Sequence, residues 1–144
     1  MSSDPGADLA VYLETAGYGE WKNANPALNT IFRDELPDLP ANCIGIWINN
    51  GKRPEHFCGA DLGVLEYPIA DIIVRNASKA TARDRAETIR QLFSLSANLG
   101  NEYVAEMAAG SYPVYLGRDD SNRHKFSVSI ELTVERRNNI RSVI

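Results

Sequence analysis

Apolar and polar residues alternate without a break over residues 125–135, near the end of the chain. Because successive side chains of a β-strand point to opposite faces, this alternation predicts a long strand with one buried face. The residues expected on the buried face are Phe126, Val128, Ile130, Leu132 and Val134. The other face is polar and is expected to meet either water or a partner.

Two earlier segments are predicted to pair as an antiparallel hairpin. Residues 43–49 are apolar at most positions, which predicts a strand that is central or covered on both faces. Residues 67–75 again alternate, with Ala70, Ile72 and Val74 on one face. Residues 50–63 open with an Asn-Gly turn signal and show no periodicity. They predict a long loop at the tip of the hairpin, and loops of this length are usually functional or disordered.

Helical periodicity occurs in two segments. The first starts at Asp4, a favourable N-cap followed by proline, and ends at Gly17. The second starts at Ser78 or Thr81 and runs to residue 98, with a capping box predicted between Thr81 and Asp84. The buried stripes are predicted to be Leu9, Tyr12, Leu13 and Ala16 in the first helix, and Ala82, Ala86, Ile89, Leu92, Phe93, Ser96 and Leu99 in the second.

The order of these elements predicts the fold class. Short strands are expected at 103–108 and 111–116, and a further one at 30–33 stays open because prolines lie around it. The order α-β-β-α-β-β-β predicts an α+β fold, a mostly antiparallel sheet with two helices packed on one face. We expect a single domain over residues 1–144, with 1–7 and 138–144 as flexible ends.

Composition narrows the classes of function. The 144 residues are 44% hydrophobic and 24% charged, with a net charge of −4, which is ordinary for a globular protein. An acidic chain is not expected to bind nucleic acid generally, because such binding rests on Lys and Arg. No apolar run approaches the ~20 residues of a membrane span, and no signal peptide is recognisable. Synthesis in the cytoplasm follows as the expectation, with both cysteines reduced.

Candidate chemistry is sparse. Cys43, His56 and Cys58 offer three zinc ligands, but the fourth is missing unless Asp61 or His124 supplies it. Cys58 beside a histidine also lacks the surroundings of a catalytic nucleophile. The acidic run at 119–122 lacks the bidentate Glu of a calcium loop and is expected to be a solvated turn. We therefore predict no catalytic, cofactor-binding or metal site.

The order of several short motifs resembles a known family. After the first helix come Ile-Phe-Arg at 31–33, Leu-Pro-Asp-Leu-Pro at 36–40 and Cys-Ile-Gly-Ile-Trp at 43–47. The long helix, Leu-Gly-Arg-Asp-Asp at 116–120 and Phe-Ser-Val-Ser-Ile-Glu-Leu at 126–132 follow. Over about residues 8–137 the chain resembles the minor capsid or tail-terminator proteins of long-tailed bacteriophages.

This resemblance implies a function in assembly rather than catalysis. Such proteins form a ring, typically a hexamer, that docks on the last ring of the tail-tube protein and stops its polymerisation. The ring then presents a surface to the head connector or stopper protein, and DNA passes through it without being read. The resemblance implies no catalytic residues, no cofactor and no membrane. It places the protein in the virion, at the junction of tail and head, after assembly in the host cytoplasm.

Two groups of residues are candidates for the contacts of such a ring. The loop at 50–63 is a candidate tail-docking element, with Lys52, Arg53, Glu55 and His56 as its charged residues. If so, deletion of residues 52–62 should leave the fold intact and abolish tail joining. The polar face of the last strand is a candidate subunit interface, with Lys125, Ser129 and Glu131.

Three other functions stay open on the sequence. A head-completion stopper or a tail-tube subunit would share the general character of the chain, although a tube subunit would polymerise into long cylinders. A small enzyme or ligand-binding α+β domain would have to use His56, Cys58 or His124. A host-side interaction module is the third alternative.

Overall fold

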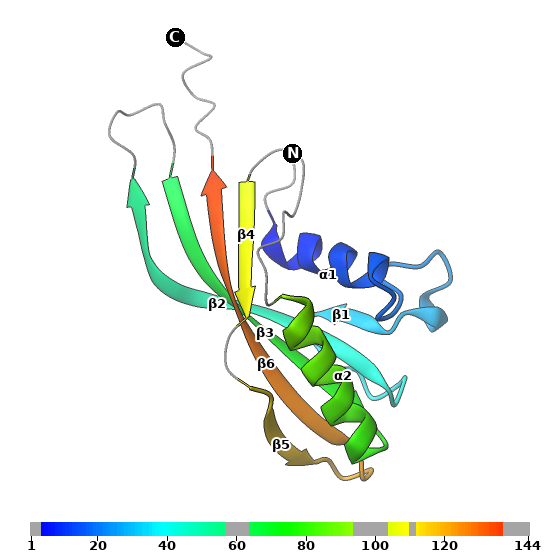
Figure 1. The fold of residues 1–144 in the computed structure, drawn as a ribbon. Coiled ribbons are helices and arrows are strands. Elements are labelled where there is room, and N and C mark those ends of the chain that lie inside the picture. Colours follow the sequence, from blue (N-terminus) through cyan, green and yellow to red (C-terminus); the bar gives the residue numbers. More distant parts are fainter. Residues whose placement is uncertain (1–3, 57–63, 94–103, 110–111, 137–144) are drawn as a thin grey trace.

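The computed structural model describes residues 4–56, 64–93, 104–109 and 112–136 (Figure 1). In chain order, the elements are α1 (Pro5–Thr15), the 3-10 turn η1 (Pro26–Leu28), β1 (Ile31–Arg33), β2 (Cys43–His56), β3 (Val64–Asn76), α2 (Lys79–Leu92), β4 (Val104–Ala109), β5 (Val114–Arg118) and β6 (His124–Arg136). The fold is α+β, as the sequence predicted, and the open strand at 30–33 is present as β1.

One six-stranded sheet organises the molecule, in the order β1-β2-β3-β6-β4, with β5 also paired to β6. β1 runs parallel to β2, and every other pairing is antiparallel. β4 pairs with residues 130–135 of β6, and β5 pairs with residues 124–127. Since β4 and β5 share the same edge of β6 at different levels, β6 is held along nearly its whole length.

The loop predicted at 50–63 is wrong over residues 50–56. Residues 50–56 continue β2, and β3 begins at Val64 rather than at residue 67. The extended pairs include Lys52 with Tyr67 and His56 with Val64. Register shifts at 49–52 and 52–55 accommodate the turn-like composition, because a bulge inserts residues without ending a strand. The loop that remains, at 57–63, lies outside the described residues.

This extension gives the sheet an arm. We use this name for residues 50–56 of β2, 64–68 of β3, 131–136 of β6, and β4. Figure 1 shows the ends of these strands rising past both helices. The candidate docking residues Lys52, Arg53, Glu55 and His56 therefore lie on a paired strand of the arm and not in a loop.

Both helices pack on the same face of the sheet, as predicted (Figure 1). α1 contacts β1 and β2, while α2 contacts β3 and β6. The helices meet through the rings of Tyr12 and Phe93, whose centroids are 5.4 Å apart. The predicted strand positions Ile72, Val128 and Ile130 are fully buried under them. Helices and sheet therefore share one core.

The helix boundaries depend on local caps. Asp4 caps α1 by accepting from the Gly6 N–H at 3.1 Å, as predicted. In the predicted buried stripe of this helix, Ala16 is exposed, and Ala10 is buried instead. Ser78 caps α2 by accepting from the Thr81 N–H at 3.3 Å. The predicted Thr81–Asp84 capping box is wrong, because both residues already lie inside the helix. Ser96 and Leu99 lie outside the described residues.

The flexibility expected of residues 1–7 stays a prediction. Residues 5–7 belong to α1, and both Pro5 and Gly6 are buried. Residues 1–3 and the expected flexible end at 138–144 lie outside the described residues.

Candidate functional site

The segment 34–42 crosses the sheet face opposite the helices, held by a buried arginine of β3. Arg75 is only 4% exposed. Its guanidinium donates to the carbonyl oxygens of Ala41 at 3.0 Å and Pro40 at 2.8 Å, and also to that of Pro37. A Cβ on Gly45 would lie 2.8 Å from the Glu35 carbonyl oxygen, so the segment packs directly on the β2 backbone. This explains why the strand predicted at 43–49 is covered on both faces at its start.

A second arginine fixes the far end of the same segment. Arg123 donates to the Asp38 carboxylate at 3.0 Å and also to the Asp38 carbonyl oxygen. Its Nε donates to Asp119 at 2.7 Å. The backbone N–H groups of Ser121 and Arg123 also donate to the Asp119 carboxylate. These hydrogen bonds close a turn at 119–122. Backbone donation from Arg123, with the arginine's charge, lowers the pKa of Asp119.

Beyond this segment, side-chain hydrogen bonds connect polar residues of three neighbouring strands on the same face. Asp71 of β3 accepts from the Ser129 hydroxyl at 2.8 Å and from the Asn49 amide. Glu131, two residues further along β6, is exposed. Lys125 is half-buried and lies opposite Gly117 of β5. Of the three candidate interface residues, Ser129 thus already forms a hydrogen bond within its own chain.

Several exposed apolar side chains follow one another on and beside β5. Exposed fractions are 72% for Tyr112, 55% for Val114 and 47% for Leu116. β5 pairs with β6 along one edge, and its other edge has no strand partner among the described residues. Three cations border this strand: Lys79 lies 4.4 Å from the Tyr115 ring centroid, Arg90 lies 4.4 Å from that of Tyr112, and Arg118 ends the strand.

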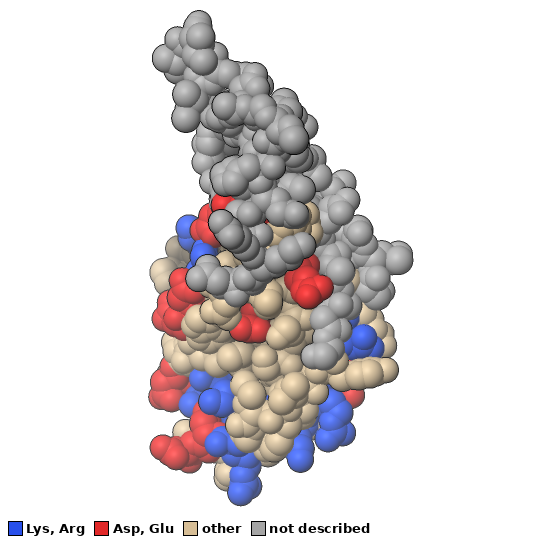
Figure 2. Space-filling view, turned by 90° about the vertical axis from the view of Figure 1, so that its left-hand side faces the viewer, with Lys and Arg blue, Asp and Glu red and all other residues tan. Residues whose placement is uncertain are grey.

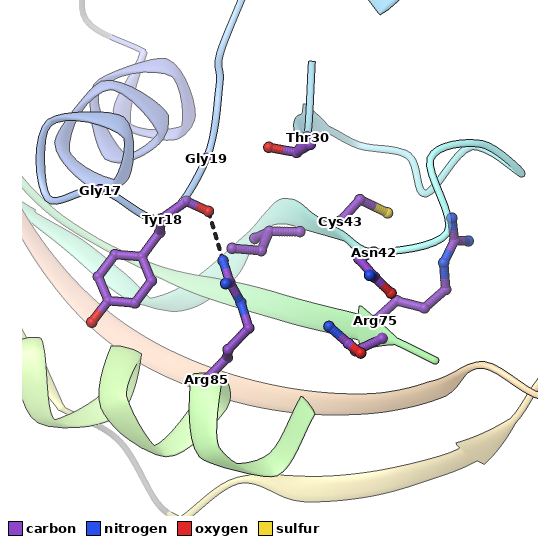
Figure 3. Close-up of a pocket in the computed structure, with 10 residues that line it drawn as sticks. Gly17, Tyr18, Gly19, Thr30, Asn42, Cys43, Arg75 and Arg85 are labelled. Carbon is purple, nitrogen blue, oxygen red and sulfur yellow. Dashed lines mark hydrogen bonds between the residues drawn. The ribbon is translucent and has the colours of Figure 1, made fainter. Parts of the chain in front are cut away.

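A pocket of about 290 Å³ opens between the end of α1, α2 and the sheet (Figure 3). Figure 3 shows Arg85 reaching across it to donate to the Tyr18 carbonyl oxygen, at 2.8 Å. The Cys43 thiol on its wall is buried, and burial raises its pKa despite the charges of Arg75 and Arg123. A raised thiol pKa opposes nucleophilic chemistry, since the thiolate is the reactive form.

The described part of the chain does not bring together the ligands of a metal site. No group of three or more His, Cys, Asp or Glu side chains there could hold a metal ion. His124 forms a hydrogen bond with Tyr115, whose hydroxyl lies 2.9 Å from the Nδ1 atom of His124. The side chains of His56 and Cys58 lie outside the described residues.

Sequence reasoning missed the parts of this surface that hold it together. The partners of Arg75 are carbonyl groups at least 34 residues away in sequence, and no local pattern marks such contacts. The exposure of β5 had a weak signal, because Tyr-Pro-Val-Tyr-Leu at 112–116 is apolar at consecutive positions. Such a run fits a buried strand equally well.

The described residues therefore define the class of protein by its fold and surfaces. It is an α+β scaffold with a projecting sheet arm, an exposed apolar edge strand and an ordered cover over one end of the sheet. The model of the bacteriophage tail terminator protein family matches residues 12–136, so the chain belongs to that family. It is thus a structural protein of the phage tail, and its family is not a known class of enzymes. A search among curated proteins finds no match. Within the described residues, no helix has the length and apolar character to span a membrane.

Proposed function

We propose that this protein closes the end of the phage tail tube as a ring, stops the tube's polymerisation and provides the surface for head joining. The observation that carries the proposal is the family match over residues 12–136, which spans both the helix-covered body and the arm. The ring has the tail-tube protein on one side and the head connector or stopper protein on the other. DNA passes through without sequence-specific contacts.

The arm is the proposed tail-docking element. Its strands pair with one another beyond the helices, so it extends as a continuous part of the sheet (Figure 1). β2 has two register shifts within or next to the arm, and irregularities of this kind are common beside binding sites. Lys52, Arg53, Glu55 and His56 are its proposed tail-contacting residues.

Substitution tests this docking element better than deletion does. Removing residues 52–62 would take away a paired part of β2, so the deletion would damage the sheet itself. The double variant K52E/R53E keeps the strand and should assemble normally while joining few tails to heads. Normal joining by this variant would exclude these two residues from docking.

The ring contact is proposed to lie on the side of the sheet formed by β5 and β6, where Lys125 borders β5. Ser129 and Glu131 stay candidates further along β6. An exposed apolar edge strand favours pairing with another chain and is therefore expected to be covered in the assembled virion.

The mass of the protein in solution, with negative-stain images, tests the ring. Six copies of the 15.9 kDa chain give about 95 kDa. We expect closed rings of about that mass. Long cylinders would instead indicate a tail-tube subunit, and a monomer that also fails to assemble on tail tubes would contradict the proposal.

A further inference from the structure

We propose that the ring contact joins two unlike surfaces: the β5 strip of one copy and the β1 flank of the next. The β5 strip comprises Tyr112, Val114, Leu116, Arg118 and Lys79. The β1 flank comprises Glu20, Leu28, Asp34 and Glu35. This inference rests on the proposed ring and names the surfaces that close it.

The β5 strip combines apolar area with positive charge. Its apolar side chains are roughly half exposed or more, and Lys79 of α2 contacts the Tyr115 ring of the same strand. Lys79, Arg90 and Arg118 border the apolar side chains of the strip, and Arg90 is paired with Glu87 of its own helix. Figure 2 views the molecule from the side on which β5 lies and shows a tan area in the lower part, with blue side chains to its right and below.

The β1 flank has the opposite character. Residues 5–35 hold five acidic and two basic side chains, a net charge of −3. Glu20 lies beside β1, because its carbonyl oxygen accepts from the Ile31 N–H at 3.0 Å. Asp34 and Glu35 follow the strand directly, and both are exposed. Leu28 of η1, three residues before β1, is 53% exposed and adds apolar area to the segment that leads into the strand.

The two surfaces lie on opposite sides of the molecule. β1 is one edge of the sheet, and β5 lies beyond β6 at the other (Figure 1). A contact between opposite sides is heterologous, and repeated contacts of this kind generate a ring when the rotation closes. A two-fold contact through β5 would instead bring two basic strips together, which like charge disfavours. Charge complementarity therefore favours a second copy, arranged head to tail, as the occupant of the β5 strip.

Paired charge reversals test this contact. The variant K79E/R118E makes the β5 strip acidic, and the variant E20K/E35K makes the β1 flank basic. All four side chains are exposed, so both variants should fold. Alone, each variant repels itself and should need about a hundredfold higher concentration than wild type to form rings. Mixed one to one, the variants are complementary at every contact of an alternating ring, so rings should return.

Two single variants serve as matched controls. Lys22 is exposed within the acidic region. K22E makes the same charge change as K79E, but on the acidic surface, where added negative charge should not weaken the contact with a basic strip. Asp84 is exposed on α2, so D84K repeats the charge change of E20K on the basic side. Both controls should assemble at least as well as wild type, whereas K79E and E20K should each assemble less well.

Sedimentation velocity distinguishes the failure of this inference from the failure of the proposed function. Wild-type rings that persist in each double variant alone would overturn the assignment of the surfaces and leave the ring intact. Loss of rings in E131K, with rings retained in K79E/R118E, would move the contact to the open face of β6. Rings retained in K79E/R118E with loss of binding to duplex DNA would assign the strip to DNA instead. A wild-type protein that never forms rings, even on tail tubes, would overturn both proposals.

Discussion

Arg75 shows how a single buried side chain can shape a whole surface of this protein. Its guanidinium has several donors in a fixed fork, and here they reach carbonyl groups of the proline-containing segment at 37–41. The segment has no regular secondary structure to satisfy those groups itself. The ordered cover over one end of the sheet therefore depends on this arginine, with Arg123 assisting at Asp38.

We predict that R75M lowers the free energy of unfolding by about 2–4 kcal/mol, because several carbonyl groups lose a charged donor at once. R83M is the matched control. Arg83 is exposed on α2, so its replacement should change stability by less than about 0.5 kcal/mol. Urea denaturation of both variants measures the difference. Equal stabilities would show that the segment holds itself in place without Arg75.

The ion pair of Asp4 with Arg33 predicts a pH dependence. Burial alone would raise the pKa of Asp4, but the Arg33 guanidinium, 2.6 Å away, and the N–H groups of α1 lower it below 3.8. A lowered pKa stabilises the fold above the unfolded-state pKa, and this stabilisation is lost as pH falls through the folded-state value. D4N keeps a good N-cap and removes the charge.

At pH 7 D4N should therefore be less stable than wild type by about 0.5 kcal/mol, a small value because the pair is partly exposed. The difference should shrink toward zero as pH falls below 3.8, the ordinary value for Asp. Chemical denaturation at several pH values measures it. A difference that stays constant down to the acid limit would show that the charge of Asp4 contributes nothing.

At the scale of elements, periodicity predicted most of the fold. The alternation at 125–135 gave β6, and the helical spacing gave both α1 and the buried stripe of α2. Both signals are strong because one face of each element is buried against the shared core. The far end of β2 was missed, since Asn50, Gly51 and Pro54 are locally typical of turns. Pairing with β3 overrides that preference. Beyond residue 46, β2 has no second partner strand among the described residues, so this part of β2 is an edge. Proline is tolerated in an edge strand.

The start of α2 provides a prediction that separates the two possible caps. S78A should lower the free energy of unfolding by about 1 kcal/mol, because the Thr81 N–H loses its acceptor. T81A should be nearly neutral, since the Thr81 side chain is exposed. Thermal unfolding of both variants measures the two effects. A larger loss in T81A than in S78A would restore the capping box that the sequence predicted.

At the scale of the whole molecule, the two ends of the sheet are suited to different tasks. One end is covered by both helices and by the segment 34–42, while the arm extends past the helices. The fold class could be predicted from the sequence. The exposed surfaces could not be predicted, because the exposure of a strand depends on which strands pair with its edges. β5 is an example, since it pairs with β6 alone among the described strands. The family match gives these surfaces their context in the phage tail.

The central claim is that this protein ends the growth of the tail tube, and tail length measures it most directly. Tails from a phage that lacks the protein, imaged by negative-stain electron microscopy, should be overlong or variable in length and should lack heads. Supplying the wild-type chain should restore one uniform length and head joining. Uniform, head-joined tails in the absence of the protein would contradict the account.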